Sequence, residues 1–138
     1  MKKKIAILGS TGSIGKTLID IIDKNKKNFE IKLLTANKNY KTLLEQAEKF
    51  KVKNIIITDK KKYDLVKIKY KKKKINVFNN FDDLNIIFKK KIDYSMSSIT
   101  GIDGLLPTLN LIKFSKTISI ANKESIICGW NLISKELK

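Results

Sequence analysis

The sequence predicts an α/β fold, a doubly wound and mostly parallel sheet with helices on both faces. Short apolar segments of four to seven residues alternate along the chain with amphipathic stretches of ten or more. That alternation is typical of consecutive β-α-β units, in which each apolar segment forms a buried strand of a parallel sheet. A chain of 138 residues fits one globular domain of this kind and is too short for two.

The first half of the chain predicts three strands and two helices. Residues 5–8, 29–34 and 54–58 are apolar and contain β-branched side chains, which favours buried strands. The first two strands are each followed by a stretch whose apolar residues recur at helical spacing and therefore share one face. The apolar face of the first helix consists of Ile14, Leu18, Ile21 and Ile22, and that of the second of Tyr40, Leu43, Leu44, Ala47 and Phe50.

The second half is less regular. A lysine-rich helix is predicted between residues 59 and 74, and another helix over residues 81–88. A long strand at 92–98 precedes a helix at 104–113, in whose first turn Pro107 needs no amide donor. The last elements are a strand at 118–121 and a helix over 125–137. The apolar residues that indicate the two less regular helices are Tyr63, Leu65, Val66 and Ile68 in one and Phe81, Leu84, Ile87 and Phe88 in the other.

The net charge of +17 comes from 30 basic residues, all of them lysine, against 13 acidic ones. Such a charge raises nucleic acid or an anionic membrane as a partner. However, abundant lysine, asparagine and isoleucine without arginine is what AT-rich codons impose on a whole proteome, and nucleic-acid readers rely on arginine for bidentate contacts. We therefore expect no nucleic acid and no membrane partner, and we expect the lysine runs 60–62, 71–74 and 89–91 to lie on solvated faces and loops.

A cytoplasmic location is expected. No apolar run approaches the ~18–20 residues that cross a bilayer, and residues 5–8 are too short for the core of a signal peptide. The single cysteine, Cys128, cannot form an internal disulfide, and the lack of histidine removes the usual zinc clusters. We expect Cys128 to be a buried structural thiol.

A glycine-rich loop lies between the first strand and the first helix. Residues 9–15 read Gly-Ser-Thr-Gly-Ser-Ile-Gly, which places glycines at three-residue intervals. In a Rossmann-like fold, glycines there allow a tight turn, a close approach of the backbone to a pyrophosphate and close packing of the helix on the sheet. Amides at the start of the helix then face the phosphates, with the hydroxyls of Ser10, Thr11 and Ser13 as further donors. The alternative is a tight turn that serves only the fold.

The end of the second strand bears on which dinucleotide binds. An acidic residue there would accept hydrogen bonds from the ribose hydroxyls of NAD, and none is present. Asn37, Lys38 and Asn39 instead offer a cation and amide donors where the 2′-phosphate of NADPH would lie. The same residues are equally suited to cap the following helix, and a cap and a phosphate site can use the same amides.

A third polar cluster, Ala-Asn-Lys-Glu-Ser at 121–125, follows the apolar stretch 118–120 of the last predicted strand. Ligands bind at such strand ends in open parallel sheets, where a lysine can hold a phosphate as a point charge. Taken alone, the cluster is better explained as the polar cap of the next helix.

Together with Gly-Leu-Leu-Pro-Thr-Leu at 104–109, these segments resemble one family, the 1-deoxy-D-xylulose 5-phosphate reductoisomerases of the non-mevalonate isoprenoid pathway. Three motifs match in order over nearly the whole chain: 9–15, 104–109 and 121–125. The sequence departs from the family at Asn37, where glycine is frequent, and at Met96-Ser97-Ser98, where smaller apolar residues are frequent. The resemblance implies conversion of 1-deoxy-D-xylulose 5-phosphate to 2-C-methyl-D-erythritol 4-phosphate with NADPH.

The resemblance also assigns site residues. It implies that Lys123 contacts the sugar phosphate. It implies that the cofactor NADPH is bound by Thr11, Gly12, Ser13 and Ile14 at its phosphates, by Asn37, Lys38 and Asn39 at its adenosine end, and by Asn122 and Glu124.

The family reaction further needs a divalent metal, Mn²⁺, Mg²⁺ or Co²⁺. By resemblance, the metal-binding carboxylates follow the third motif, beyond Lys138, so no catalytic residue and no metal ligand is expected within this chain. Residues 1–138 are thus expected to be the N-terminal NADPH-binding domain, without the catalytic metal-binding domain and the C-terminal helical domain, and inactive alone. Family members form homodimers through parts outside this segment. The alternatives are a non-enzymatic NADP-binding module, a decayed pseudoenzyme, or a lysine-rich nucleic-acid binder.

Overall fold

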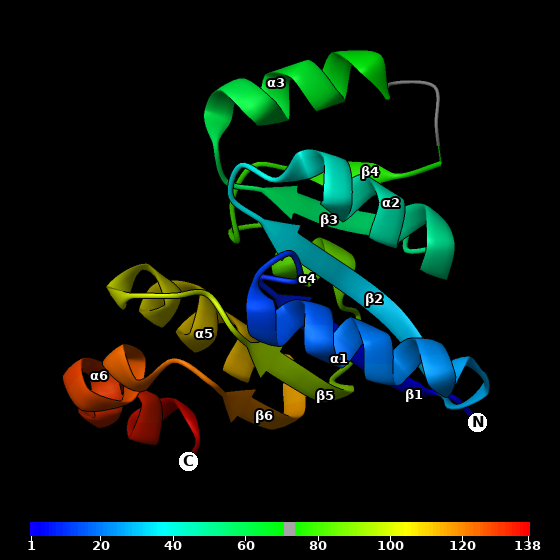
Figure 1. Ribbon diagram of the computed structural model, residues 1–138. Helices are drawn as coiled ribbons and strands as arrows, with labels where there is room; N and C mark the ends of the chain where they lie inside the picture. Colours follow the sequence, from blue (N-terminus) through cyan, green and yellow to red (C-terminus); the bar gives the residue numbers. More distant parts are fainter. Residues whose placement is uncertain (71–73) are drawn as a thin grey trace.

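The computed structural model describes residues 1–70 and 74–138. The described residues form one sheet with the strand order β4-β3-β2-β1-β5-β6, and every neighbouring pair is parallel (Figure 1). The fold class predicted from the sequence is therefore confirmed, and the sheet is wholly rather than mostly parallel. The strands are β1 (Lys3–Leu8), β2 (Phe29–Ala36), β3 (Asn54–Ile57), β4 (Asn76–Phe78), β5 (Ile92–Ser97) and β6 (Ser115–Ile120).

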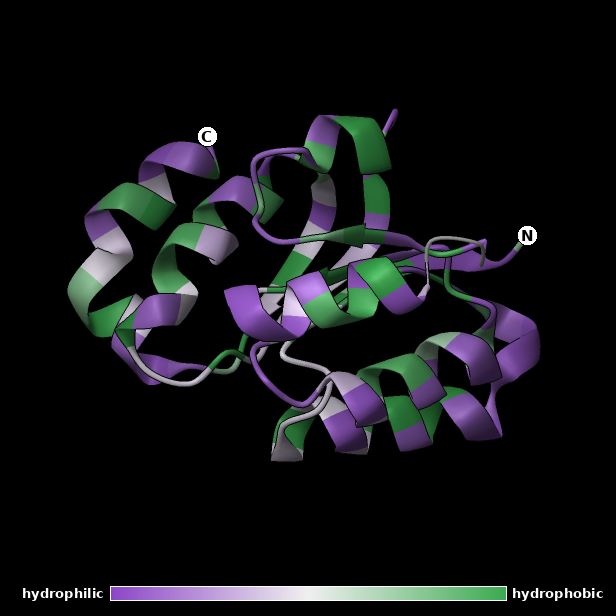
Figure 2. Cartoon of the chain, turned by 90° about the horizontal axis from the view of Figure 1, so that it is seen from above, coloured by the Kyte–Doolittle hydropathy of each residue, from purple (hydrophilic) through white to green (hydrophobic). Residues whose placement is uncertain are grey.

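Helices cover both faces of the sheet. One buried cluster joins alternate residues of β1, β2 and β3 to α1 (Ser13–Lys24), α2 (Tyr40–Phe50) and α3 (Lys60–Lys69). A second cluster joins the other residues of these strands to α4 (Leu84–Ile87) and α5 (Leu105–Ile112), which therefore lie on the opposite face. The last helix, α6 (Lys123–Glu136), packs on α5. Figure 2 shows hydrophobic and hydrophilic residues alternating along the helices, as expected when one side of each helix packs on the sheet or on a neighbouring helix.

The order of the strands creates a crevice beside β1. The chain moves outward from β1 through β2 and β3 to β4, and then returns to place β5 on the other side of β1. The connections after β1 and β5 consequently leave the carboxyl edge of the sheet toward opposite faces. This is the topological switch point at which open parallel sheets bind ligands.

The structure corrects several details of the sequence-based expectations. In α1, Ile14 and Ile21 are 47% and 52% exposed, and Ile19 is buried instead, because the inner face runs through Gly15, Ile19 and Ile22. The predicted helix over 81–88 is only one turn long. The short edge strand β4 was not predicted, because three residues are too few to establish a period of two.

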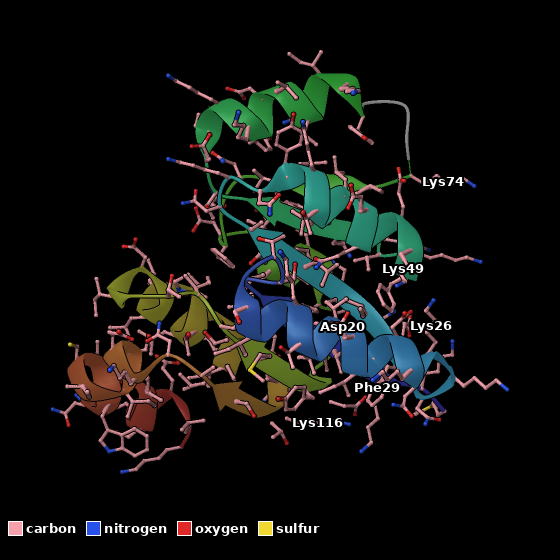
Figure 3. The ribbon with its side chains drawn as sticks, in the orientation of Figure 1. Asp20, Lys26, Phe29, Lys49, Lys74 and Lys116 are labelled. Atoms are coloured by element: carbon pink, nitrogen blue, oxygen red, sulfur yellow. The ribbon has the colours of Figure 1, made fainter. Side chains whose placement is uncertain are left out.

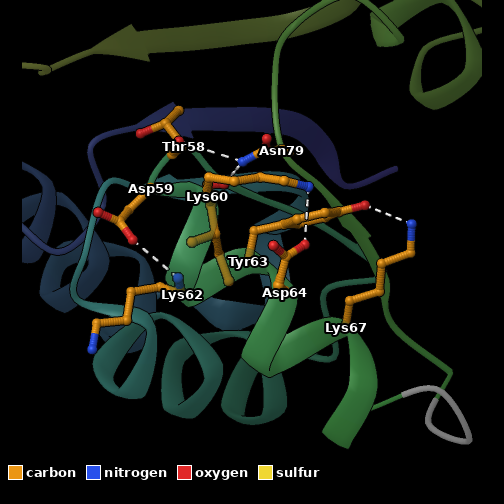
Figure 4. A network of polar contacts seen from close by, with 9 residues as sticks. Thr58, Asp59, Lys60, Lys62, Tyr63, Asp64, Lys67 and Asn79 are labelled. Carbon is orange, nitrogen blue, oxygen red and sulfur yellow. Dashed lines mark hydrogen bonds and ion pairs between the residues drawn. The ribbon is translucent and has the colours of Figure 1, made fainter.

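The lysine-rich helix α3 is amphipathic only in part. Its buried residues are Tyr63 and Val66, whereas the predicted core residues Leu65 and Ile68 are exposed. Figure 4 shows the polar contacts that hold it: Lys60 pairs with Asp64 at 2.9 Å, and Lys67 Nζ donates to the Tyr63 hydroxyl at 2.6 Å. The lysines of runs 60–62 and 89–91 lie at least partly in solvent. Of the run 71–74, residues 71–73 are outside the described residues.

At the other end of the sheet, α1 and α2 are joined by an ion-pair cluster. Lys26, which follows α1, and Lys49, in the last turn of α2, lie close together in Figure 3, and both contact the Asp23 carboxylate at 2.8 Å. Hydrogen bonds from Lys26 and then from Lys49 lower the pKa of Asp23 below its ordinary value. The cluster holds the carboxyl-terminal ends of α1 and α2 together. It therefore lies at the opposite end of α1 from the glycine loop.

Candidate functional site

The glycine loop leaves β1 at the switch point, in a conformation that depends on two of its glycines. Gly9 has a φ of +74°, and a Cβ there would lie 2.9 Å from the Ser98 carbonyl oxygen on the strand β5 side. Gly15 packs α1 onto the loop, since a Cβ there would lie 2.6 Å from Cα of Ser10. Both positions therefore exclude a side chain for steric reasons. At Gly12 the nearest atom to such a Cβ is the Gly9 carbonyl oxygen at 3.5 Å, so a methyl group would fit there in ordinary van der Waals contact.

The start of α1 lacks a side-chain cap. The starts of α2, α3 and α6 are capped by Asn39, Asp59 and Asn122, whose side chains each accept a backbone N–H of the first turn. The N-cap of α1 is Gly12, which has no side chain to accept such a bond, and α1 has no acidic residue in its first turn. Residues 12–14 are exposed. The α1 amides and the positive end of the helix dipole therefore face solvent at the switch point, which suits an anion.

Ser10 differs from the sequence-based expectation. It is fully buried, and its hydroxyl donates to Gln46 Oε1 at 2.7 Å rather than facing the crevice. Its amide donates to the Thr35 carbonyl at 2.9 Å, and the Gly9 amide donates to Thr35 Oγ1 at 2.9 Å. The hydroxyl of Ser10 is therefore not available to a phosphate, which leaves Thr11 and Ser13 as the hydroxyl-bearing residues of the loop that reach solvent.

The segment after β2 lies at the same carboxyl edge of the sheet. Asn37, Lys38 and Asn39 are all exposed. Asn39 caps α2 by accepting the Thr42 amide at 3.4 Å, so the capping role considered for this segment is confirmed. Asn37 accepts from the Thr58 hydroxyl at 3.2 Å, and its φ is not positive, so this position does not require glycine.

Asn122 braces the opposite wall of the crevice. Its side-chain amide donates to the carbonyls of Ile99 and Gly101 at 2.5 and 2.7 Å, and its Oδ1 accepts the Ser125 amide at 2.7 Å. Asn122 is only 6% exposed, and these three hydrogen bonds of its side chain are all to the protein backbone. The side chain thus joins the loop after β5 to the start of α6 and confirms the capping explanation for the third motif. Gly104 lies directly beneath it, where a Cβ would come 2.8 Å from the Ile99 carbonyl.

A cavity of about 230 Å³ lies between these loops. Sequence reasoning missed the segment 98–101 as part of its wall, because Ser98 and its neighbours match no binding motif. Ile14 belongs to this wall too, which explains why an apolar residue of α1 remains exposed. The cavity is lined by Ile14, Ser98, Ile99, Thr100, Gly101, Ala121, Asn122, Lys123 and Glu124.

A larger cavity, of about 380 Å³, lies at the amino-terminal edge of the sheet, opposite the glycine loop. It has no uncapped helix start and no glycine turn, so the features that suit a dinucleotide are all at the carboxyl edge. Among its lining residues, seven are lysines: Lys4, Lys32, Lys51, Lys53, Lys89, Lys90 and Lys91.

The structure also bears on Cys128, on metal binding and on membrane spans. Cys128 is exposed on α6, so the expectation of a buried thiol was wrong. Within residues 1–70 and 74–138, no three His, Cys, Asp or Glu side chains are grouped closely enough to hold a metal ion. In the same residues, no helix has the length and apolar character that crossing a membrane requires.

A wholly parallel sheet with a glycine loop and an uncapped helix at its switch point is characteristic of the Rossmann-like domains that bind dinucleotides. Within that class, the sequence is specific. The chain belongs to the 1-deoxy-D-xylulose 5-phosphate reductoisomerase family, whose model matches residues 5–129.

Individual relatives agree with the family. The 1-deoxy-D-xylulose 5-phosphate reductoisomerase of Pelagibacter ubique is 62% identical over 138 residues, which are 99% of this chain and 36% of the relative. That of Phocaeicola vulgatus is 39% identical over 97% of this chain and 35% of the relative. The chain thus spans about a third of the length of the curated relatives it matches.

Solved structures show the same fold. The reductoisomerase of Zymomonas mobilis in complex with NADPH superposes with a TM-score of 0.88 at 31% identity, covering 99% of this chain and 36% of that one. A reductoisomerase in complex with NADPH, fosmidomycin and magnesium superposes with a TM-score of 0.86 at 28% identity, covering 98% of this chain and 34% of that one.

Proposed function

We propose that this chain is the N-terminal NADPH-binding domain, residues 1–138, of a 1-deoxy-D-xylulose 5-phosphate reductoisomerase. The observation that carries the proposal is the uncapped start of α1 behind the open Gly12 position, at the switch point of the sheet. Free amides, a helix dipole and a glycine without a close neighbour leave room for a pyrophosphate to approach the backbone. The Zymomonas mobilis relative, with which this chain shares its fold and 31% of its residues, was solved with NADPH.

The proposed cofactor site extends along the carboxyl edge of the sheet. The phosphates lie against Thr11, Gly12, Ser13 and Ile14, where the amides of the α1 start are exposed. The 2′-phosphate lies near Asn37, Lys38 and Asn39, of which Lys38 supplies the positive charge. When bound, NADPH supplies the hydride of the family reaction.

The other wall of the crevice completes the proposed site. Glu124 and Lys123 line the cavity beside Ile14, with Lys123 exposed and able to hold the phosphate of 1-deoxy-D-xylulose 5-phosphate as a point charge. Asn122 contributes to the cofactor site by holding the loop 98–101 in place through its two donated bonds. The divalent metal, the remaining substrate contacts and the homodimer contacts of the family are proposed to lie in the part of the relatives that this chain does not span.

Charge reversal at Lys38 tests the proposal. Because only NADPH carries the 2′-phosphate, Lys38→Glu should weaken NADPH about tenfold more than NADH in titrations of the 138-residue chain followed by cofactor fluorescence. Lys27→Glu is the matched control, since Lys27 is exposed in the short turn between α1 and β2, at the amino-terminal edge, and changes the net charge equally. Equal weakening of both cofactors by Lys38→Glu would remove Lys38 from the site, and no binding of NADPH to the unaltered chain would refute the function.

A further inference from the structure

A buried polar cluster of Ser10, Thr35 and Gln46 connects the glycine loop to β2 and α2. The three residues are 0%, 1% and 7% exposed, and Thr35 and Gln46 lie outside the three sequence motifs. Gln46 Nε2 donates to the Ser10 carbonyl at 3.0 Å, and the Ser10 hydroxyl donates to Gln46 Oε1 at 2.7 Å. The Gln46 side chain thus bonds both the backbone and the side chain of the residue that follows Gly9.

The directions of these two hydrogen bonds are fixed by chemistry. The Ser10 carbonyl can only accept, so the amide nitrogen of Gln46 must face it. The amide oxygen then faces the Ser10 hydroxyl, which must donate. Only an amide, or a carboxylic acid that keeps its proton, can supply one donor and one acceptor in this arrangement. A buried residue with such a specific demand is not explained by the apolar packing of α2, whose other buried residues are Leu43, Leu44 and Ala47.

We propose that Gln46 is a positioning residue that holds the glycine loop in its binding conformation. Ser10 is immediately followed by Thr11, Gly12 and Ser13, whose exposure at the start of α1 depends on where Ser10 is anchored. Thr35 supports the same anchor by accepting the Gly9 and Ser10 amides, and it lies two residues before Asn37. The cluster therefore fixes the phosphate loop relative to the segment 37–39. This inference rests on the proposed binding of NADPH.

Two substitutions at Gln46 test the inference in the 138-residue chain. Gln46→Met keeps the approximate volume but forms neither hydrogen bond, so Kd for NADPH and Kd for NADH should both rise about tenfold, because the pyrophosphate is common to them. Amide hydrogen exchange at Gly9, Ser10 and Gly12 should become faster without any dinucleotide present. Ser115→Ala is the matched control, because it removes a buried hydroxyl that bonds Ser95 and the Leu111 carbonyl at the amino-terminal edge.

Gln46→Glu provides a readout that a loss of packing would not give. An ionised carboxylate cannot donate to the Ser10 carbonyl, whereas the protonated acid can, and burial raises the pKa of such a carboxyl. The affinity of Gln46→Glu for NADPH should therefore approach that of the unaltered chain as the pH falls from 8 toward about 5.5, while Gln46→Met stays weak throughout.

The outcomes separate the inference from the proposed function. Unchanged amide exchange and unchanged Kd in Gln46→Met, or a Gln46→Glu affinity that does not depend on pH, would overturn the positioning role. Faster exchange at Gly9, Ser10 and Gly12 in Gln46→Met, in a chain that binds no NADPH before substitution, would support the anchor and refute the proposed function.

Discussion

Gly15→Ala and Gly12→Ala should separate two uses of glycine in one loop. In Gly15→Ala, the new methyl group would lie 2.6 Å from Cα of Ser10, about 1 Å closer than ordinary van der Waals contact, and the obstacle is backbone that cannot rotate away. Overpacking of this kind costs about 1–3 kcal/mol, and the contact with backbone places Gly15 at the upper end of that range. The better helix propensity of alanine returns about 1 kcal/mol. A net loss of about 1–2 kcal/mol remains, which lowers Tm by roughly 3–7 °C for a domain of this size.

Gly12→Ala has room for its methyl group, since the nearest atom is 3.5 Å away, so Tm should change little. The methyl group would nevertheless occupy the space through which a pyrophosphate approaches the backbone, so NADPH affinity should fall. Thermal unfolding followed by circular dichroism and titration with NADPH measure the two effects. A Tm for Gly15→Ala equal to or above that of the unaltered chain would refute the close packing of α1 on the loop. A Gly12→Ala chain that binds NADPH normally would refute the proposed approach of the phosphates.

Two further predictions concern pH and turnover. Asp93 accepts from Lys116 Nζ and from the Lys4 amide, each at 2.8 Å, and these bonds, Lys116 first, lower its pKa below the ordinary value of 3.8. Ionised Asp93 therefore stabilises the fold above pH 3.8 and loses this effect as the pH falls through its lowered pKa, so the Tm difference from Asp93→Asn should be present at pH 7 and shrink as the pH falls below 3.8. A Tm difference between the unaltered chain and Asp93→Asn that persists unchanged at low pH would contradict this pH dependence. The 138-residue chain mixed with NADPH, 1-deoxy-D-xylulose 5-phosphate and Mn²⁺ should not oxidise NADPH, and absorbance at the nicotinamide band that declines in proportion to added chain would show otherwise.

Much of the fold could be predicted from the sequence because its strands are short, apolar and separated by amphipathic segments. The errors occurred where tertiary contacts decide. Ile14 has the spacing of a core residue, but it begins α1 at the crevice, where no layer covers it. Cys128 falls on an outward face of α6, whose inner face is set by Gly129 packing on Leu105. Neither arrangement is encoded in local periodicity.

The candidate site was predictable to the level of segments but not of side-chain roles. Strand ends in a parallel sheet meet at one edge, so the three segments that the sequence singled out, after β1, β2 and β6, lie there together. Which polar groups face the crevice depends on partners that are distant in sequence. The Ser10 hydroxyl, for example, is hydrogen-bonded to Gln46, which is 36 residues away. One signal was available, because Gln46 follows Leu43 by three residues and so lies on the apolar face of α2. A polar residue there indicates a buried hydrogen-bonding partner.

The lysine-lined cavity at the amino-terminal edge has a consequence for how the chain behaves in solution. Folding brings seven lysines to the lining of one cavity, with Glu30 as the only carboxylate-bearing residue among the lining residues. Salt screens charges that lie more than a Debye length apart, about 10 Å at 0.1 M, so added salt should weaken the mutual repulsion of these lysines and raise Tm. The two edges of the sheet therefore differ in the source of their positive potential. At the amino-terminal edge it comes from lysine side chains, and at the carboxyl edge it comes from the oriented backbone dipoles at the start of α1.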